Sequence, residues 1–251
     1  MTEEELKQIQ ENPELLVRFM ASRRFSNFAR YMNPKLDMTN FHKVYYEVLD
    51  KFAKGEIRKL IVSVSPQCGK SEGSSRLLPA FLLGLNPELK IVIGSYNADQ
   101  AKSFNRDVQR IVNSEAYKAT FPDTYFNNGK LRMDNVYLCN SEVSEPVGHS
   151  GFVRAVGRNG ALTGKAVDIL ILDDVYKDYN EANSPIIREQ AFKWYSSVCR
   201  TRLHNDSQEL IVFTRWHEDD LIGRIEQSGE PIIDLKNWAQ LKDIPFGAWV
   251  Y

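Results

Sequence analysis

The sequence predicts an α/β fold in which a central, mainly parallel sheet is flanked by helices, with a helical segment at the N-terminus. Short apolar runs suited to buried strands lie at residues 60–64, 90–96 and 169–172. Amphipathic stretches with helical spacing separate these runs, and small or polar residues stand where the runs end. Strands that alternate with helices are typical of a parallel sheet, whose loops gather functional groups at one edge.

Composition and charge narrow the class of protein. The 251 residues are 43% hydrophobic and 26% charged, as in a soluble globular protein of one large or two small domains. Because the net charge is −1, any contact with a polyanion would have to come from a local patch of basic residues. No apolar run is long enough to cross a bilayer, and the acidic start argues against a signal peptide. The three widely spaced cysteines and four histidines fit neither zinc nor disulfides, and suit a reducing compartment.

The first 56 residues are predicted to be helical. Residues 2–32 form one segment, with Thr2 and Glu5 as a capping box and a break at Asn12-Pro13. Its interleaved arginines and aromatics fit either a docking surface or, as we favour, a helix lying on its own domain. Residues 36–56 predict an aromatic-rich helix just before the first strand. His42, near its start, either contacts the adenine of a nucleotide or is a plain surface residue.

A phosphate-binding P-loop is predicted after the first strand. Ser65-Pro66 ends the strand, and Gly69-Lys70-Ser71 leads into the next helix. This order lets backbone N–H groups and the helix N-terminus surround phosphate oxygens, while Lys70 reaches the β/γ-phosphates and Ser71 offers its hydroxyl to Mg²⁺. The first glycine of the usual pattern is replaced by Val64, so an exposed loop with a solvated lysine is the alternative. The predicted ATP ligands are His42, Ser65, Pro66, Gln67, Cys68, Gly69, Lys70, Ser71 and Glu72.

The middle of the chain continues the alternation. A buried strand at residues 90–96 precedes a helix at residues 98–115. Lys102, Arg106 and Arg110 share one face of that helix, which is either a solvated surface or a track for phosphates or a neighbouring subunit. Residues 117–150 are irregular, with one strand at residues 136–138. A short strand then enters a glycine-rich loop at residues 151–160, which contains two arginines.

Two carboxylates mark the second site of chemistry. Asp173 and Asp174 follow four consecutive apolar residues, which predict a fully buried strand. At the carboxyl end of a parallel sheet, Asp173 would lie beside Ser71 and complete the Mg²⁺ site, and Asp174 would face the γ-phosphate and the attacking water. The alternative is a pair of structural turn residues. The strand at residues 90–96 and the second acid together indicate the motor-type (ASCE) branch of P-loop NTPases.

The last part of the chain adds a helix and a strand. Ser184-Pro185 predicts the start of a helix that runs to about residue 202. A strand at residues 209–213 ends at Thr214, whose hydroxyl is placed to sense the γ-phosphate. Residues 229–251 form no closing element, and we expect the chain to be cut at a domain boundary.

Four segments resemble, in order, the large terminase subunit of tailed phages. They are SPQCGKSEGSSRLLPAFLLGLNP, IVIGSYNADQAKSFNRDVQRIV, LTGKAVDILILDD and FTRWHEDDLIGRI, and the resemblance spans residues 40–228. It implies an N-terminal helical segment at residues 1–35, a P-loop ATPase core at residues 36–228 and a linker at residues 229–251. An RNase-H-like nuclease domain would follow, so no nuclease site is assigned.

The family resemblance also implies a function and partners. Large terminases use ATP and Mg²⁺ to drive double-stranded viral DNA into the procapsid. The implied partners are that DNA, the portal protein and the small terminase subunit, with no membrane. The chain would be a monomer alone and a ring, commonly a pentamer, when assembled. The implied location is the host cell cytoplasm, with transient docking on the procapsid portal.

Individual residues match the family motifs. Lys70 and Ser71 match Walker A, Asp173 matches Walker B, Asp174 stands at the catalytic glutamate position, and Thr214 matches the coupling motif.

Two departures from the family concern arginines. Gln67 stands where terminases often have a P-loop arginine, and Thr163 stands where many relatives offer an arginine to the adjacent subunit. We expect Arg158 to substitute for the latter, ahead of Arg154 and Lys165.

Two other functions share these motifs. A helicase-like DNA translocase would carry a second motor domain, for which residues 175–251 are too short. A non-catalytic nucleotide-binding assembly module would be a decayed site, signalled by Val64, Gln67 and Asp174. Mg²⁺-dependent phosphate release separates such a module from an enzyme.

Overall fold

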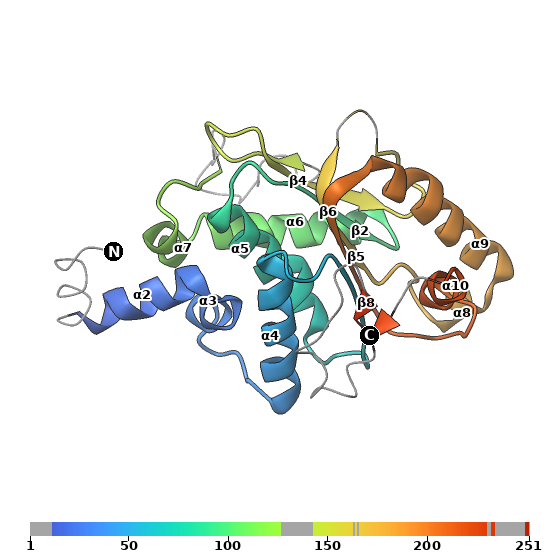
Figure 1. Cartoon of the computed structure of the whole chain (residues 1–251), viewed down its shortest axis with the longest axis horizontal. Helices are drawn as coiled ribbons and strands as arrows, with labels where there is room; N and C mark the ends of the chain where they lie inside the picture. Colours follow the sequence, from blue (N-terminus) through green and yellow to red (C-terminus); the bar gives the residue numbers. More distant parts are fainter. Residues whose placement is uncertain are drawn as a thin grey trace.

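A central, mainly parallel sheet organises the chain (Figure 1). The computed structural model describes residues 12–126, 143–162, 164, 166–229, 232–233 and 249–250. In the described chain the strand order is β3-β4-β2-β5-β6-β1-β8-β7, and only the β3–β4 pair is antiparallel. The strands are β1 (Lys59–Ser63), β2 (Lys90–Ser95), β3 (Val143–Ser144), β4 (Phe152–Gly157), β5 (Val167–Asp173), β6 (Leu203–Phe213), β7 (Ile232–Ile233) and β8 (Trp249–Val250).

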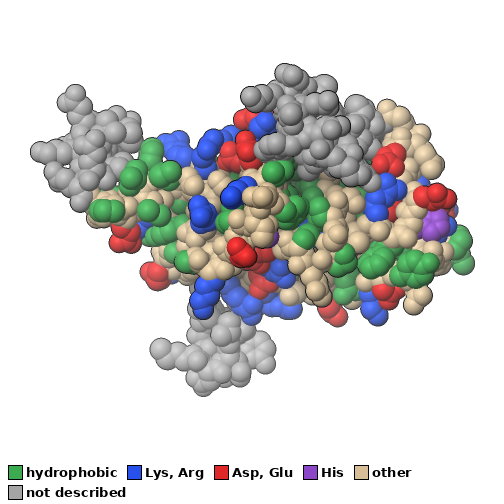
Figure 2. Space-filling model, turned by 90° about the horizontal axis from the view of Figure 1, so that it is seen from below, with side chains coloured by type: hydrophobic (Ala, Val, Ile, Leu, Met, Phe, Trp, Pro, Cys, Tyr) green, Lys and Arg blue, Asp and Glu red, His purple; other side chains and the backbone are tan. Residues whose placement is uncertain are grey.

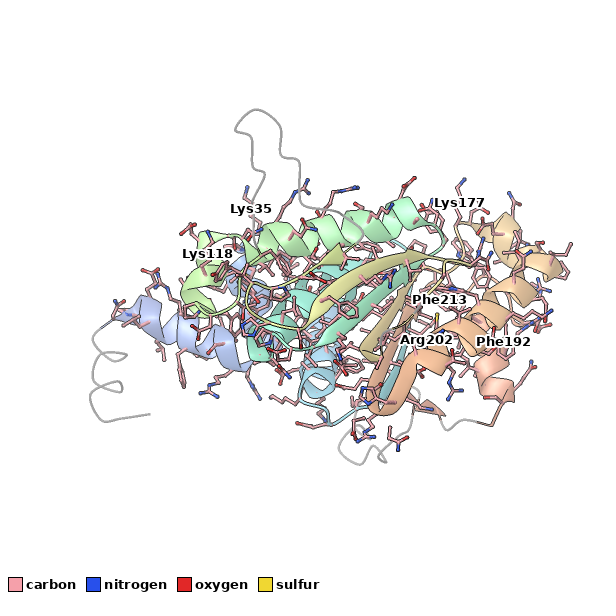
Figure 3. All side chains as sticks on the ribbon, turned by 90° about the horizontal axis from the view of Figure 1, so that it is seen from above. Lys35, Lys118, Lys177, Phe192, Arg202 and Phe213 are labelled. Carbon is pink, nitrogen blue, oxygen red and sulfur yellow. The ribbon has the colours of Figure 1, made fainter. Side chains whose placement is uncertain are left out.

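Helices cover both faces of this sheet and bury its central strands, whereas the first half of β6 is exposed. On β1, Leu60 and Val62 join one apolar cluster, and Ile61 between them joins the other. A strand with both faces buried needs apolar residues at every position, which explains the continuous runs in the sequence. Phe213, at the end of β6, lies in the second cluster (Figure 3).

The first cluster lies under α3 (Phe25–Met32), α4 (Asn40–Ala53), α5 (Leu78–Leu85), α6 (Ala98–Val112) and α7 (Glu115–Thr120). The second lies under α8 (Tyr179–Asn183), α9 (Pro185–Trp194) and α10 (Leu221–Gln227). Helix α2 (Pro13–Arg23) precedes α3 and buries only Ala21.

The strand order brings three strand ends together. Strand β6 lies between β1 and β5, with Ser63 opposite Phe213 and Asp173 opposite Val212. The loops after these strands therefore meet at one edge of the sheet. In space, the strand that separates β1 from β5 is β6, because β2 lies on the far side of β5.

Several predicted boundaries change. The helix predicted at residues 98–115 is α6 followed by the short α7. The helix predicted at residues 184–202 is α9, which continues as a π-turn (Tyr195–Cys199) and a 3₁₀-turn (Arg200–Arg202). Strand β6 begins six residues before the predicted start at 209, because its polar first half gives no apolar signal. The Thr2/Glu5 capping box, the strand at residues 136–138 and Cys139 lie outside the described residues.

The molecular surface carries both signs of charge. Figure 2 shows Lys and Arg side chains interspersed with Asp and Glu over the lower face. Among the described residues, no helix has the length and apolar character needed to span a membrane.

Candidate nucleotide site

The loop after β1 has the backbone of a tight phosphate-binding turn. Gln67 and Gly69 have φ angles of +61° and +80°, the left-handed region that turns the chain sharply. Ser65, Pro66 and Gln67 are exposed, and Cys68 is half-buried. His42 lies against this loop, because a Cβ added to Gly69 would stand 2.8 Å from its Nε2. The other ring nitrogen, Nδ1, is 2.8 Å from the Thr39 hydroxyl.

The helix that follows the loop starts with a π-helical turn, Glu72–Leu77, which the sequence did not predict. The Lys70 carbonyl accepts hydrogen bonds from the Tyr45 hydroxyl at 2.8 Å and from Ser74 Oγ at 3.0 Å. Gly73 allows the Tyr45 and Tyr46 rings to approach, since a Cβ there would lie 2.9 and 2.7 Å from them. These contacts fix Lys70 to helix α4, and π-turns within helices often mark functional sites.

Lys70, Asp174 and Thr214 converge from three loops. The Lys70 side chain is only 8% exposed, and its Nζ lies 3.4 Å from Asp174 Oδ2. The same Nζ lies 3.5 Å from Thr214 Oγ1, which donates to the Val64 carbonyl at 3.0 Å. The Thr214 backbone N–H approaches Asp174 Oδ1 at 3.4 Å. An ammonium, a half-exposed carboxylate and a hydroxyl therefore share one small space.

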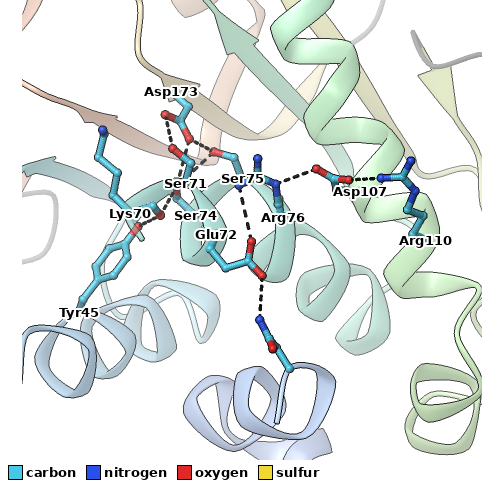
Figure 4. A network of polar contacts seen from close by, with 11 residues as sticks. Tyr45, Lys70, Ser71, Glu72, Ser74, Ser75, Arg76, Asp107, Arg110 and Asp173 are labelled. Carbon is cyan, nitrogen blue, oxygen red and sulfur yellow. Dashed lines mark hydrogen bonds and ion pairs between the residues drawn. The ribbon is translucent and has the colours of Figure 1, made fainter. Parts of the chain in front are cut away.

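Asp173 is fully buried and lies beside Ser71, Ser74 and Ser75 (Figure 4). Its Oδ1 accepts from Ser71 Oγ at 3.0 Å, and its Oδ2 accepts from Ser75 Oγ and, at 3.5 Å, from Ser74 Oγ. Burial and the neighbouring Asp174 raise the pKa of Asp173 to about 6, against the lowering effect of Ser75, Ser71 and Lys70. Ser74 and Ser75 were not among the predicted site residues, and the small polar run Gly73-Ser74-Ser75 was the only signal.

The oxygen donors at this position suit Mg²⁺. Ser71 and Asp173 offer a hydroxyl and a carboxylate at one spot. In the described part of the chain, no group of three or more His, Cys, Asp or Glu forms a metal cage. Mg²⁺ is commonly held by one or two protein oxygens together with substrate phosphates, so this sparse donor set fits it. Glu72 instead contacts Asn33 at 3.4 Å and Arg76 at 3.6 Å.

The arginine predicted to serve a neighbouring subunit is held within its own chain. Arg158 Nη1 donates to the Val175 carbonyl at 2.7 Å and to Glu181 Oε2 at 2.9 Å, and its side chain is 10% exposed. In this conformation Arg158 does not project from the molecule. Arg154 lies half-buried on β4. Thr163 and Lys165 lie outside the described residues.

The family of the chain follows from its sequence. Residues 61–246 match the model of the family "Terminase large subunit, T4likevirus-type, N-terminal". The chain belongs to this family. The match starts within β1 and includes the P-loop, Asp173, Asp174 and Thr214. No protein with a curated description matches the chain.

Solved structures agree on the fold. The structure is similar to the HK97 bacteriophage large terminase, with a TM-score of 0.51 and 15% identity over 92% of this chain and 43% of that one. The Thermus phage P74-26 large terminase ATPase domain also matches, with a TM-score of 0.43 and 20% identity over 71% of this chain and 70% of that one. The chain thus spans less than half the length of the HK97 terminase. The similarity to the HK97 structure shows that the described sheet has the fold of a large terminase.

Proposed function

We propose that this chain is the ATPase part of a large terminase and hydrolyses ATP to move double-stranded viral DNA into a procapsid. The observation that supports this proposal is the convergence of Lys70 with Asp174 at 3.4 Å and with Thr214 at 3.5 Å, next to the hydrogen-bonded pair of Ser71 and Asp173. A lysine, a buried carboxylate with a hydroxyl and a second carboxylate are the groups that phosphoryl transfer to water requires.

Each residue has a defined role in the proposed reaction. The Lys70 ammonium offsets negative charge that develops on the β/γ-phosphate oxygens. Asp174, exposed on one side, orients a water molecule and accepts its proton. The Thr214 hydroxyl, bonded to the end of β1, would report loss of the γ-phosphate to β6. Ser71 and Asp173 would hold Mg²⁺, which neutralises phosphate charge when bound with the nucleotide.

Family membership supports a proposal about the partners and the setting. We infer that the chain works with viral DNA, a portal protein and a small terminase subunit, in the host cytoplasm and docked on the procapsid portal. We also infer that it is a monomer alone and joins a ring, commonly a pentamer, on assembly. An arginine from a neighbouring subunit accelerates hydrolysis by about 10³–10⁵ where such fingers act. The isolated chain should therefore hydrolyse ATP slowly, and the rate per chain should rise with concentration.

The decisive experiment is Mg²⁺-dependent phosphate release by the purified chain. We expect slow release from the wild type, none from Lys70→Ala, and ATP binding without release from Asp174→Asn. Lys118→Ala, which removes a half-exposed lysine paired with Glu115 at 2.9 Å, is the matched control and should behave as the wild type. Nucleotide binding without hydrolysis by the wild type would favour an assembly module. Absence of binding would refute the site.

A further inference from the structure

The Arg158 side chain is directed at the turn that presents Asp174. Its Nη1 binds the Val175 carbonyl, one residue beyond Asp174, at 2.7 Å. The same nitrogen binds Glu181 of helix α8 at 2.9 Å. Glu181 Oε2 also accepts from the backbone N–H of Lys177 at 2.9 Å. One ion pair thus connects the end of β4, the turn after β5 and helix α8.

The turn at Asp174 needs such support. Asp174 has a φ of +44°, a left-handed conformation that is unfavourable for a residue other than glycine. Strand ends hold it from two sides. Its N–H donates to Val212 at 3.0 Å and its carbonyl accepts from Tyr96 N–H at 2.9 Å. A strained residue of this kind persists only where its surroundings determine it fully.

The Arg158 backbone belongs to the same framework. Its N–H donates to the Ser95 carbonyl at 2.7 Å, one residue before Tyr96. The backbone of Arg158 therefore fixes the end of β2, and its side chain fixes the far side of the Asp174 turn. One attachment thus reaches the residue after Asp174, and the other reaches the residue before Tyr96, whose N–H binds the Asp174 carbonyl. The Asp174 carboxylate lies 3.4 Å from Lys70.

We propose that Arg158 is a positioning residue, which acts in its own subunit through the Val175 carbonyl to hold Asp174 toward the γ-phosphate. This inference rests on the proposed ATPase function. To serve a neighbour instead, the guanidinium would have to leave two hydrogen bonds, one of them charge-assisted, and the partly buried Glu181 carboxylate would lose its cationic partner.

The two roles predict opposite results for Glu181→Gln. If Arg158 positions the turn, the amide weakens the ion pair and lowers kcat. If Arg158 acts on a neighbour, the substitution releases the guanidinium and leaves kcat unchanged or higher. For the positioning role we expect kcat to fall about 10–100-fold in Arg158→Ala and about 3–10-fold in Glu181→Gln, since each 1.4 kcal/mol is tenfold in rate. Arg158→Lys should recover part of the loss.

The dissociation constant of a fluorescent ATP analogue and the KM for ATP should change less than about threefold in these variants, because Lys70 and the P-loop stay in place. Unchanged or raised kcat in Glu181→Gln would overturn the proposal, as would loss of nucleotide binding equal to the loss of kcat.

A second readout does not depend on hydrolysis. Amide hydrogen exchange in nucleotide-free protein should quicken at Tyr96 and at residues 174–176 in Arg158→Ala, because these amides lie at the turn. Arg18→Ala, which removes an arginine bonded to Tyr31 at 3.2 Å, is the control and should leave that exchange unchanged. Unchanged exchange in Arg158→Ala would refute the positioning role. A wild type without ATPase activity would refute the proposed function, while the exchange result still decides whether Arg158 holds the turn.

Discussion

At the residue scale, Asp173 combines full burial with a charge that the proposed site needs. The folded protein raises its pKa from 3.8 to about 6, so ionisation is unfavourable in the absence of a cation. Because the folded protein raises the pKa of this acid, the folded state binds the proton more tightly than the unfolded chain does. The contribution of Asp173 to stability is fully present below about pH 4 and is lost as the pH rises through about 6. A shift of about two pKa units corresponds to roughly 3 kcal/mol.

Asp173→Asn should therefore stabilise the nucleotide-free protein at pH 8. In EDTA, we expect its Tm to exceed that of the wild type by about 6–12 °C, because each kcal/mol moves Tm by about 2–4 °C at this chain length. The gap should close as the pH falls toward 4. Asp206→Asn, on an exposed side chain paired with Arg58 at 3.1 Å, is the control. Equal Tm values at pH 8 would show that Asp173 ionises there without cost.

Gly69 is constrained both by its positive φ angle and by a close neighbour, whereas Gly55 is constrained by its φ angle alone. Both Gly69 and Gly55 have left-handed φ angles, +80° and +76°. Only Gly69 has a close neighbour, since an added Cβ would be 2.8 Å from His42 Nε2, whereas nothing lies within 4 Å of one at Gly55.

Gly55→Ala should lower the free energy of unfolding by about 1–2 kcal/mol, through backbone strain alone, and leave nucleotide affinity unchanged. Gly69→Ala should weaken ATP-analogue binding at least tenfold, because the loop must move. Adding His42→Ala to this variant should recover only the part of the lost affinity that is due to crowding between the new Cβ and the His42 ring. Wild-type affinity in Gly69→Ala, measured by fluorescence titration, would argue that nucleotide does not enter this loop.

The predictable site residues are those that belong to local motifs. Lys70 and Ser71 follow a strand and precede a helix, and Asp173 and Asp174 end a buried strand, so the sequence alone places them at one edge. Ser75 escaped prediction because its contact with Asp173 depends on the π-turn. The direction of the Arg158 side chain depends on Glu181, 23 residues later, and no local pattern encodes such a distance.

At the element scale, a buried arginine connects α8, α9 and the segment after β6. Arg188 is 8% exposed at its side chain, donates to the Ala182 carbonyl at 2.8 Å and lies 3.1 Å from Asp219 Oδ2. Arg224 also binds Asp219, at 2.9 Å, and with Arg188 it lowers the pKa of that carboxyl to about 2. The segment that begins at Thr214 is thereby tied to two helices.

Arg188→Met should destabilise the protein by about 2–3 kcal/mol. The change keeps the volume and leaves the Ala182 carbonyl unpaired, and loss of one partner of a buried pair costs more than loss of a surface pair. Lys193→Ala, on the same helix with a side chain 72% exposed, should cost less than about 0.5 kcal/mol. Denaturant unfolding measures both. Equal effects would mean that the described network adds nothing to stability.

Element types were more predictable than element ends. The apolar runs give β1, β2 and β5, and helical spacing gives α6 and α9. The first half of β6 is polar and exposed, so its pairing with β5 left no periodic signal. Helix α8, which is capped by Asp178, has only five residues and is too short to show a hydrophobic repeat.

At the scale of the whole molecule, the order of the strands in the sheet could not be predicted from the sequence alone. A continuous apolar strand indicates burial on both faces but does not name its neighbours. The position of β6 between β1 and β5 depends on its pairing with β1, in which Lys59 lies opposite Glu209, and only the Thr214 motif pointed to it. That order places Thr214 within reach of both Val64 and Asp174.

The two N-terminal helices, α2 and α3, differ in how far they pack into the hydrophobic core. In α3, Phe25 and Phe28 are fully buried in the same cluster as Leu60 and Val62 of β1. Phe25 meets Tyr46 and Phe81 at ring-centroid distances of 5.2 and 5.6 Å. By contrast, α2 buries only Ala21 and keeps several apolar side chains exposed. Helix α3 is therefore part of the same packed core as β1.

Two deletions should differ sharply for this reason. Removing residues 1–23 should lower the free energy of unfolding much less than removing residues 1–32, because only the longer deletion uncovers Phe81 and Tyr46. Phe28→Ala alone should cost about 3–5 kcal/mol, the usual loss for a buried phenylalanine. Thermal unfolding and binding of a hydrophobic dye compare the variants. If the longer deletion unfolds at the same temperature as the shorter one and binds no more dye, α3 is an appendage and the aromatic cluster closes without it.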